Sequence, residues 1–350
     1  MTVRVGILGC GAIARAAHLP SLASVPDARV VALSDPDGTS LTTAQSLVRH
    51  ARAVGDYRDV LAMADVDAVV VALPPALHAD ATLAALQQGK HVYVEKPLAT
   101  TLADGVRVVA AARATSLTAM MGFNYRFHSI VQSARDCIAG GGIGAPVAVR
   151  TVFATPARAI APWKARRRDG GGALLDLGVH HVDLLRFLLG AEVTAVSADI
   201  QSIRTEHDTA FLHSRLTCGC SAASMFALSS VDEDLIEVYG SKAKLAIDRY
   251  DSFRVEVSPP IARGALAYAA TRLAGELAEL PYAARKRRAP MHDLSFPAAM
   301  HAFIRAVRDR APASPSLDDG LCALAVIDAA ESSARLGRVV GIDPDGAGSR

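Results

Sequence analysis

The chain has 350 residues, of which 51% are hydrophobic and 21% charged, and its formal net charge is +2. This composition excludes a disordered chain, and the near-neutral charge gives no electrostatic reason to expect nucleic acid or an anionic membrane as a partner. The length suits two domains better than one. The first residues enter a strand at once, no apolar run reaches the roughly 18 residues of a membrane span, and the five cysteines follow no disulfide framework. We therefore expect a cytoplasmic protein without a secretory signal.

The N-terminal residues predict a dinucleotide-binding turn. Val3–Gly9 has the pattern of a short buried strand, and a helix to about Ala23 follows the glycine-rich segment. This segment matches G-x-G-x-x-G/A through Gly9, Gly11 and Ala14, and we expect four of its residues to lie against a pyrophosphate: Gly9, Gly11, Ala12 and Ile13. Asp35, about 20 residues past the motif at the end of the strand Arg29–Ser34, is expected to accept hydrogen bonds from an adenosine ribose.

Strands and helices alternate through the first 122 residues. Further strands are predicted at Ala68–Leu73, His91–Val94 and Leu117–Gly122, each after a helical stretch. Alternation of this kind implies a parallel sheet with right-handed crossovers, so residues 1–122 are predicted to form an α/β Rossmann domain. Ligands bind at the carboxyl ends of such strands. Further cofactor contacts are therefore expected from Leu73, Pro74, His78, Glu95, Lys96 and Asn124.

Two of these assignments have a structural alternative. His78 is equally well explained as a packed side chain of the helix after Pro75, and Glu95 and Lys96 as a solvent-exposed ion pair.

The cofactor preference rests on Ser34–Ser40, which contains two acids, Asp35 and Asp37, and no base. An NADP 2′-phosphate needs a positive partner there, so NAD is predicted to be preferred over NADP.

The segment from Gly170 to Asp183, "GGGALLDLGVHHVD", places charged side chains on an apolar helix. Asp176, His180 and Asp183 lie at i, i+4 and i+7, on one stripe, while His181 points away from it. Buried carboxylates and imidazoles are costly unless they are paired or face a pocket. A zinc site is the rival explanation, but adjacent histidines diverge on a helix, and we expect no metal.

These motifs together resemble the glucose–fructose oxidoreductase, inositol dehydrogenase and MocA family. The resemblance is carried by the N-terminal G-x-G-x-x-A with Asp35, by "PPALHADATLAALQQGKHVYVEKP", by "GFNYRF" and by "DLGVHHVD". Asp176 and His180 meet the family's pattern of an aspartate and a histidine four residues later. The resemblance implies a second domain, residues 123–345, with a large, mostly antiparallel sheet whose exposed face serves self-association as a homodimer or homotetramer. It also supports a cis peptide bond between Lys96 and Pro97.

The second part of the chain agrees with this expectation. The segments with strand-like composition are Val147–Ala154, Val193–Ile203, Thr209–Cys218, Ala222–Ser229, Leu235–Tyr239 and Phe253–Val257. Helical stretches are predicted at Gly264–Ala284, Phe296–Arg308 and Leu317–Leu336, and the last residues from Gly346 as a frayed tail. Tyr125, Arg126, Trp163 and His180 are candidates for substrate binding. The basic runs Arg166–Arg168 and Arg285–Arg288 either bind a phosphate or are solvated.

The expected activity is hydride transfer between NAD and a sugar, polyol or related cyclic alcohol. His180 is the candidate base, Asp176 would orient its imidazole, and Lys96 would stabilise the developing alkoxide or relay its proton, with this helix facing the nicotinamide across a cleft between the domains. Two other functions remain open: a glycoside hydrolase or lyase that uses tightly bound NAD for transient oxidation, and a non-catalytic sensor of sugar or dinucleotide. Retention of Lys96, Asp176 and His180 argues against the sensor.

Overall fold

A computed structural model of the chain describes residues 2–157, 160–250, 254–258, 287–288 and 293–343. It divides into two compact units. The first comprises residues 1–124, 168–170 and 293–324, and the second comprises residues 125–167, 171–292 and 325–350. The sequence places everything from residue 123 to 345 in one second domain, whereas the structure groups residues 293–324 with the N-terminal unit.

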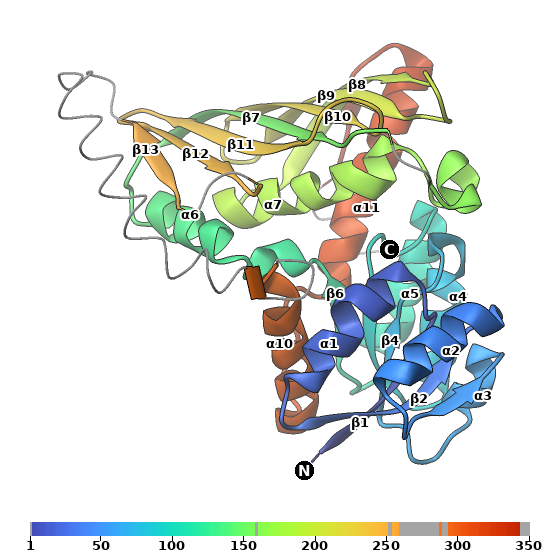
Figure 1. Cartoon of the computed structure of the whole chain (residues 1–350). Coiled ribbons are helices and arrows are strands. Elements are labelled where there is room, and N and C mark those ends of the chain that lie inside the picture. Colours follow the sequence, from blue (N-terminus) through green and yellow to red (C-terminus); the bar gives the residue numbers. More distant parts are fainter. Residues whose placement is uncertain (1, 158–159, 251–253, 259–286, 289–292, 344–350) are drawn as a thin grey trace. The chain divides into compact units, whose positions relative to one another are not determined.

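The first unit is built around a six-stranded parallel sheet in the order β3-β2-β1-β4-β5-β6 (Figure 1). Its strands are β1 (Val3–Leu8), β2 (Ala28–Ser34), β3 (Arg52–Val54), β4 (Ala68–Val71), β5 (His91–Glu95) and β6 (Ala119–Gly122). Its helices are η1 (Ala14–His18), α1 (Leu19–Ala23), α2 (Gly38–Leu47), α3 (Tyr57–Leu61), η2 (Pro75–Leu77), α4 (His78–Gln87), α5 (Leu102–Arg113) and α10 (Ser295–Asp309). The predicted Rossmann fold is confirmed.

Apolar strand residues form the core of this unit. All four residues of β4 are buried, because helices cover both faces of a parallel sheet. Helix α10 adds a strongly amphipathic face, from which Phe303 contacts Tyr93 of β5 and Phe296 contacts His18 of η1, each edge to face. This contact explains why residues far along the chain belong to the N-terminal unit.

The second unit contains an eight-stranded sheet in the order β13-β12-β11-β7-β10-β9-β8-β14. Its strands are β7 (Pro146–Ala154), β8 (Val193–Gln201), β9 (Thr209–Leu216), β10 (Ser221–Ala227), β11 (Glu233–Gly240), β12 (Lys244–Asp248), β13 (Glu256–Ser258) and β14 (Val340–Gly341). Only the β7–β10 pairing is parallel among the pairings between these strands. Its helices are η4 (Pro162–Ala165), η6 (Leu174–Gly178), α6 (Ser129–Ala139) and α7 (Val179–Leu189). The expectation of a mostly antiparallel sheet is confirmed.

One face of the large sheet is covered by helices and the other is open. Along β9 the side chains alternate, with Ala210 and Leu212 buried and Phe211 45% exposed. Helices α6 and α7 lie on the buried face (Figure 1). Strand alternation of this kind is typical of a sheet with one face on a core.

Three segments cross the boundary between the units along the chain. These are η3 (Asn124–Phe127), η5 (Arg167–Asp169) and α11 (Leu317–Leu336). Within the first unit, Ser316 and Asp319 cap the start of α11: the Asp319 carboxylate accepts from the Ser316 backbone N–H at 2.9 Å, and the Ser316 hydroxyl accepts from the Asp319 N–H at 3.3 Å. This reciprocal cap fixes the helix start.

Most predicted elements are present with shifts of one to three residues at their ends, and α11 has the predicted bounds. The structure adds β3, β12 and β14, which have three, five and two residues. The predicted helix Gly264–Ala284, the residues of the frayed tail and the start of the strand predicted at Phe253 lie outside the described residues.

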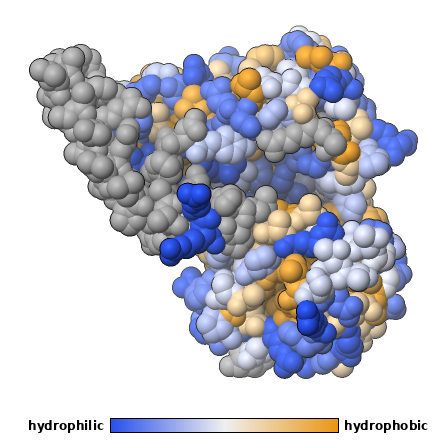
Figure 2. All heavy atoms as spheres, viewed as in Figure 1, coloured by the Kyte–Doolittle hydropathy of each residue, from blue (hydrophilic) through white to orange (hydrophobic). Residues whose placement is uncertain are grey.

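Among the described residues, no helix combines the length and the hydropathy that a bilayer span requires. In the view of Figure 2, hydrophobic and hydrophilic residues are interspersed over the surface of both units.

Candidate functional site

The glycine motif forms the predicted turn between β1 and η1. Gly9 has a φ of +92°, and a Cβ at this position would lie 2.5 Å from the Ala72 carbonyl oxygen, so a side chain is excluded. A Cβ on Gly11 would meet no described atom within 4 Å. Gly9 thus lets the turn approach the end of β4, and the backbone at Gly11 faces open space, as a pyrophosphate would require.

Asp35 lies beside this turn with both carboxylate oxygens fixed. Oδ2 accepts from the backbone N–H of Cys10 and Oδ1 from that of Asp37, each at 2.8 Å. Burial, and after it the charge of Asp35, raises the pKa of the Cys10 thiol to about 12, so Cys10 stays protonated. Each Asp35 oxygen retains acceptor capacity for a ribose hydroxyl. The arrangement therefore fits an adenosine ribose.

Arg15 is a residue of this site that sequence reasoning missed. Its guanidinium donates to the Cys10 carbonyl at 2.9 Å, and its charge helps to lower the pKa of Asp37, although hydrogen bonds from Ser40 and Thr39 do more. Asp37 also caps α2 through those N–H groups. The signal was available, because Arg15 directly follows the G-x-G-x-x-A motif.

His78 ties two loops at the carboxyl edge of the sheet. It is buried, with Nδ1 2.7 Å from the Pro97 carbonyl oxygen and Nε2 2.8 Å from the Leu73 carbonyl oxygen. Burial lowers the pKa of His78. The two carbonyl oxygens act in the opposite direction, because a ring with two N–H groups could donate to both of them. The Lys96–Pro97 peptide bond is cis, as predicted. His78 therefore has a positioning role in the loop that carries Lys96, and a contact with the cofactor stays a prediction.

Glu95 and Asn124 are also engaged within the first unit. The Glu95 carboxylate lies 2.9 Å from His18 Nε2, and it accepts from the Lys96 backbone N–H at 3.2 Å. Asn124 donates to the Ser295 hydroxyl at 2.8 Å. Glu95 is buried rather than part of a solvent-exposed ion pair, and this anchors the backbone of Lys96, whose side chain is half-buried.

In the second unit, Asp176 forms an ion pair that the sequence did not predict. Lys164 Nζ lies 2.7 Å from Asp176 Oδ2, with the lysine side chain 33% and the aspartate 15% exposed. The glycine run enables this pair, because a Cβ on Gly171 would lie 2.2 Å from the Lys164 carbonyl oxygen. Lysine is scarce in the chain, and this scarcity was the one signal that could have identified Lys164.

His180 lies against Tyr125. The two rings stack with centroids 4.1 Å apart and planes 17° apart, and His180 is 5% exposed. The neighbouring His181 instead packs among Phe153 and Phe226, and its Nε2 lies 3.0 Å from Asp234 Oδ1. Two of the predicted site residues, Tyr125 and His180, are thus brought together.

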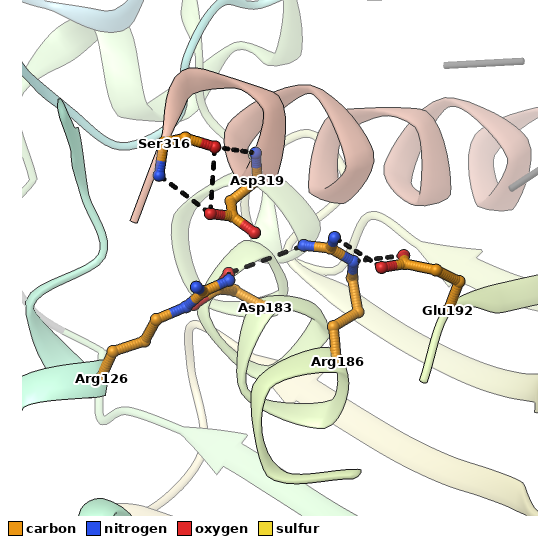
Figure 3. A network of polar contacts seen from close by, with 6 residues as sticks. All are labelled: Arg126, Asp183, Arg186, Glu192, Ser316 and Asp319. Carbon is orange, nitrogen blue, oxygen red and sulfur yellow. Dashed lines mark hydrogen bonds and ion pairs between the residues drawn. The ribbon is translucent and has the colours of Figure 1, made fainter. Parts of the chain in front are cut away.

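Arg126 forms a buried ion pair with Asp183. The guanidinium donates through Nε to Oδ2 at 2.9 Å and through a second nitrogen to Oδ1 at 2.5 Å (Figure 3). The Arg186 side chain extends from the Asp183 carboxylate toward Glu192 in the same view. Asp183 is thus engaged in an ion pair within the second unit. The same contact engages two guanidinium nitrogens of Arg126. A role of Arg126 in substrate binding stays a prediction.

The remaining candidate residues for substrate binding are Trp163 and the two basic runs. Trp163 is partly exposed, with the Lys164 ammonium 5.3 Å from its ring centroid. Of the basic run Arg166–Arg168, Arg167 is paired with Glu331. Of the second basic run, residues 285 and 286 lie outside the described residues, and Arg287 and Arg288 are exposed. Within the described ranges, no group of three or more His, Cys, Asp or Glu side chains is placed to hold a metal ion.

Comparisons with known proteins agree with this geometry. The family model GFO_IDH_MocA, an oxidoreductase family with an NAD-binding Rossmann fold, matches residues 3–123, and the GFO/IDH/MocA C-terminal domain matches residues 131–246. A dTDP-3,4-didehydro-2,6-dideoxy-alpha-D-glucose 3-reductase from Streptomyces violaceoruber is 33% identical over 87% of this chain and 85% of its own. An inositol 2-dehydrogenase from Rhizobium meliloti (strain 1021) is 30% identical over 98% of this chain and all (100%) of its own.

Solved structures share the fold. The WlbA dehydrogenase from Bordetella pertussis, in complex with NADH and UDP-GlcNAcA, has a TM-score of 0.82 at 24% identity, over 99% of this chain and 100% of that one. Other solved structures with this fold contain NADH or NADP. With both family domains matched in order and relatives aligned over most of its length, the chain belongs to the glucose–fructose oxidoreductase, inositol dehydrogenase and MocA family of oxidoreductases.

Proposed function

We propose that the chain transfers a hydride between NAD and a secondary alcohol carbon of a sugar, polyol or related cyclic alcohol. The observation that carries the proposal is the position of Lys96 directly after β5, at the sheet edge that also carries the turn of Gly9 and Asp35, which we assign to the dinucleotide. Relatives named as a sugar reductase and an inositol dehydrogenase support the substrate class.

The residues that would hold the dinucleotide are those of the glycine motif with Asp35, with Leu73, Pro74 and Asn124 as further contacts. When bound, the nicotinamide ring would supply the acceptor for the hydride that leaves the substrate carbon. The hydroxyl proton goes to His180, and Lys96 hydrogen-bonds the same oxygen, stabilising its developing charge or relaying the proton. Asp176, paired with Lys164, supplies a carboxylate one helical turn from His180.

We propose NAD as the preferred cofactor. The Asp35 carboxylate, held by two backbone N–H groups, would repel a 2′-phosphate. Arg15, the basic side chain that directly follows the motif, donates to the Cys10 carbonyl. All five cysteines are free thiols, which supports the expected cytoplasmic location.

We propose that the open face of the large sheet mediates self-association into a homodimer or homotetramer. This face holds a shallow depression of about 630 Å³ with Phe211 and Met225 among its apolar lining and with Arg150, Asp199 and His213 among its polar lining. Val147, on the same sheet, is 60% exposed. An apolar centre with a charged rim is typical of a protein interface.

The test is a screen of sugars, inositols and nucleotide sugars with NAD, read by NADH absorbance. On the best substrate, His180→Asn and Lys96→Met are each expected to lower kcat by about 10²-fold while NAD still binds. The matched controls His50→Asn and Lys242→Met alter exposed side chains and should keep wild-type rates. Near wild-type turnover in both site variants would refute the mechanism.

A further inference from the structure

The stacked rings of Tyr125 and His180 are connected to a buried charged pair. Arg249 Cζ lies 3.8 Å from the Tyr125 ring centroid, and the same guanidinium donates to the Tyr125 hydroxyl at 2.7 Å. The phenol ring of Tyr125 therefore has Arg249 and His180 as immediate neighbours, each about 4 Å from its centroid. Contacts to both the ring and the hydroxyl fix the position and the tilt of Tyr125.

Arg249 is held in turn by Asp234. Nε donates to Asp234 Oδ2 at 2.8 Å, a second nitrogen lies 2.6 Å from the same oxygen, and the other oxygen faces His181 Nε2 at 3.0 Å. The side chains of Arg249 and Asp234 are 14% and 3% exposed. Although burial opposes ionisation, Arg249 and then the His181 hydrogen bond lower the pKa of Asp234, so the pair is charged.

We infer that Arg249 is a positioning residue for His180, acting through Tyr125, and that Asp234 anchors it. The inference rests on the proposed function, because it gives a role to Arg249 in the proton transfer that we assign to His180. A planar guanidinium suits the task, because it can bind a carboxylate, donate to a hydroxyl and lie over a ring at the same time. Reactions that depend on orientation lose rate steeply when a reacting group is misplaced.

Several titratable and charged groups lie on the elements that carry the stack or contact it. Asp176 and His181 come from the segment that carries His180, Lys164 from η4, Tyr125 and Arg126 from η3, and Asp234 and Arg249 from β11 and the turn after β12. Removing Arg249 takes away a positive charge, and removing Asp234 takes away a negative one. Because charges of opposite sign have opposite effects on imidazole protonation, the two variants separate this coupling from a general loss of structure.

The experiment compares Arg249→Met, Arg249→Lys, Asp234→Asn and Tyr125→Phe on the best substrate. Arg249→Met is expected to lower kcat about tenfold or more with little change in KM, and Arg249→Lys to restore part of that loss. The pH of half-maximal kcat/KM should rise by about half a unit or more in Arg249→Met and fall in Asp234→Asn. Arg204→Met, which removes an exposed arginine, is the matched control and should match the wild type.

Tyr125→Phe keeps the ring stack and leaves no buried charge unpaired, so it tests the Arg249 contact even where the charge variants fold poorly. It should lower kcat about fivefold, the effect of one hydrogen bond. An unchanged kcat in Tyr125→Phe would overturn the inference, and so would pH-profile shifts of the same sign in Arg249→Met and Asp234→Asn. In either case, loss of activity in His180→Asn would still uphold the proposed function. If the wild type oxidises no alcohol, the proposed function fails, but the inference can still be tested by an NMR pH titration of the His180 ring in the wild type and the two charge variants. Midpoint shifts of opposite sign in Arg249→Met and Asp234→Asn would support the coupling. Midpoints equal to that of the wild type would refute it.

Discussion

Loss of the Asp183 carboxylate is expected to destabilise the second unit strongly. Asp183→Ala would leave the Arg126 guanidinium, whose side chain is 9% exposed, without the carboxylate that accepts hydrogen bonds from two of its nitrogens. Arg186, 4.0 Å from Asp183, would be a second positive charge nearby. Breaking one side of a buried ion pair costs about 3–5 kcal/mol. For a unit of this size that cost corresponds to a fall in Tm of roughly 6–20 °C.

Differential scanning calorimetry and urea unfolding measure this effect. The double variant Arg126→Met with Asp183→Leu should recover most of the loss, because it removes both charges and keeps the volume. The control Asp65→Ala breaks the pair with Arg52, in which both side chains are about half exposed, and should shift Tm far less. A Tm of Asp183→Ala within about 2 °C of the wild type would refute the reasoning. A stable Arg126→Met with raised KM would instead assign Arg126 to substrate binding.

Three further predictions concern the cofactor, the glycine run and the assembly. Asp35→Ser should raise the ratio of kcat/KM for NADP to that for NAD about tenfold or more, because the repelling carboxylate is gone and Arg15 remains; an unchanged ratio would contradict this. Gly171→Ala should lower both Tm and kcat, because its Cβ would lie 2.2 Å from the Lys164 carbonyl oxygen, and wild-type values of both would exclude the close approach. Phe211→Asp should reduce the mass in light scattering after size exclusion to that of a monomer, and an unchanged oligomer would exclude the open sheet face as the interface.

The sequence by itself determined the elements whose chemistry is local. The turn at Gly9 follows from a strand, two glycines and a helix within a few residues, and Asp35 from the end of the next strand. The bounds of α11 and the alternation along β9 follow from periodicity, because 3.6-residue and two-residue patterns are set by backbone geometry alone. Elements without such a pattern, such as the short β3, could not be found in this way.

Tertiary structure decided which partner each polar side chain received. The stripe of Asp176, His180 and Asp183 was visible in the sequence, but its first residue lies in the π-helical η6, where the wider turn changes the direction of the side chains from that of an α-helix. Asp183 pairs with Arg126, which lies 57 positions earlier in the chain, and His181 pairs with Asp234, which lies 53 positions later.

The same limit applies to α10, which packs with the N-terminal unit, and to Arg249, which lies 124 positions from Tyr125. The spacing of residues along the chain fixes the relative directions of their side chains only within one helix or strand. A buried charge needs an opposite charge wherever folding can bring one, and many arginines of this chain could have served. Which of them is close enough depends on how strands and helices pack, and that is decided by the burial of apolar surface over the whole unit.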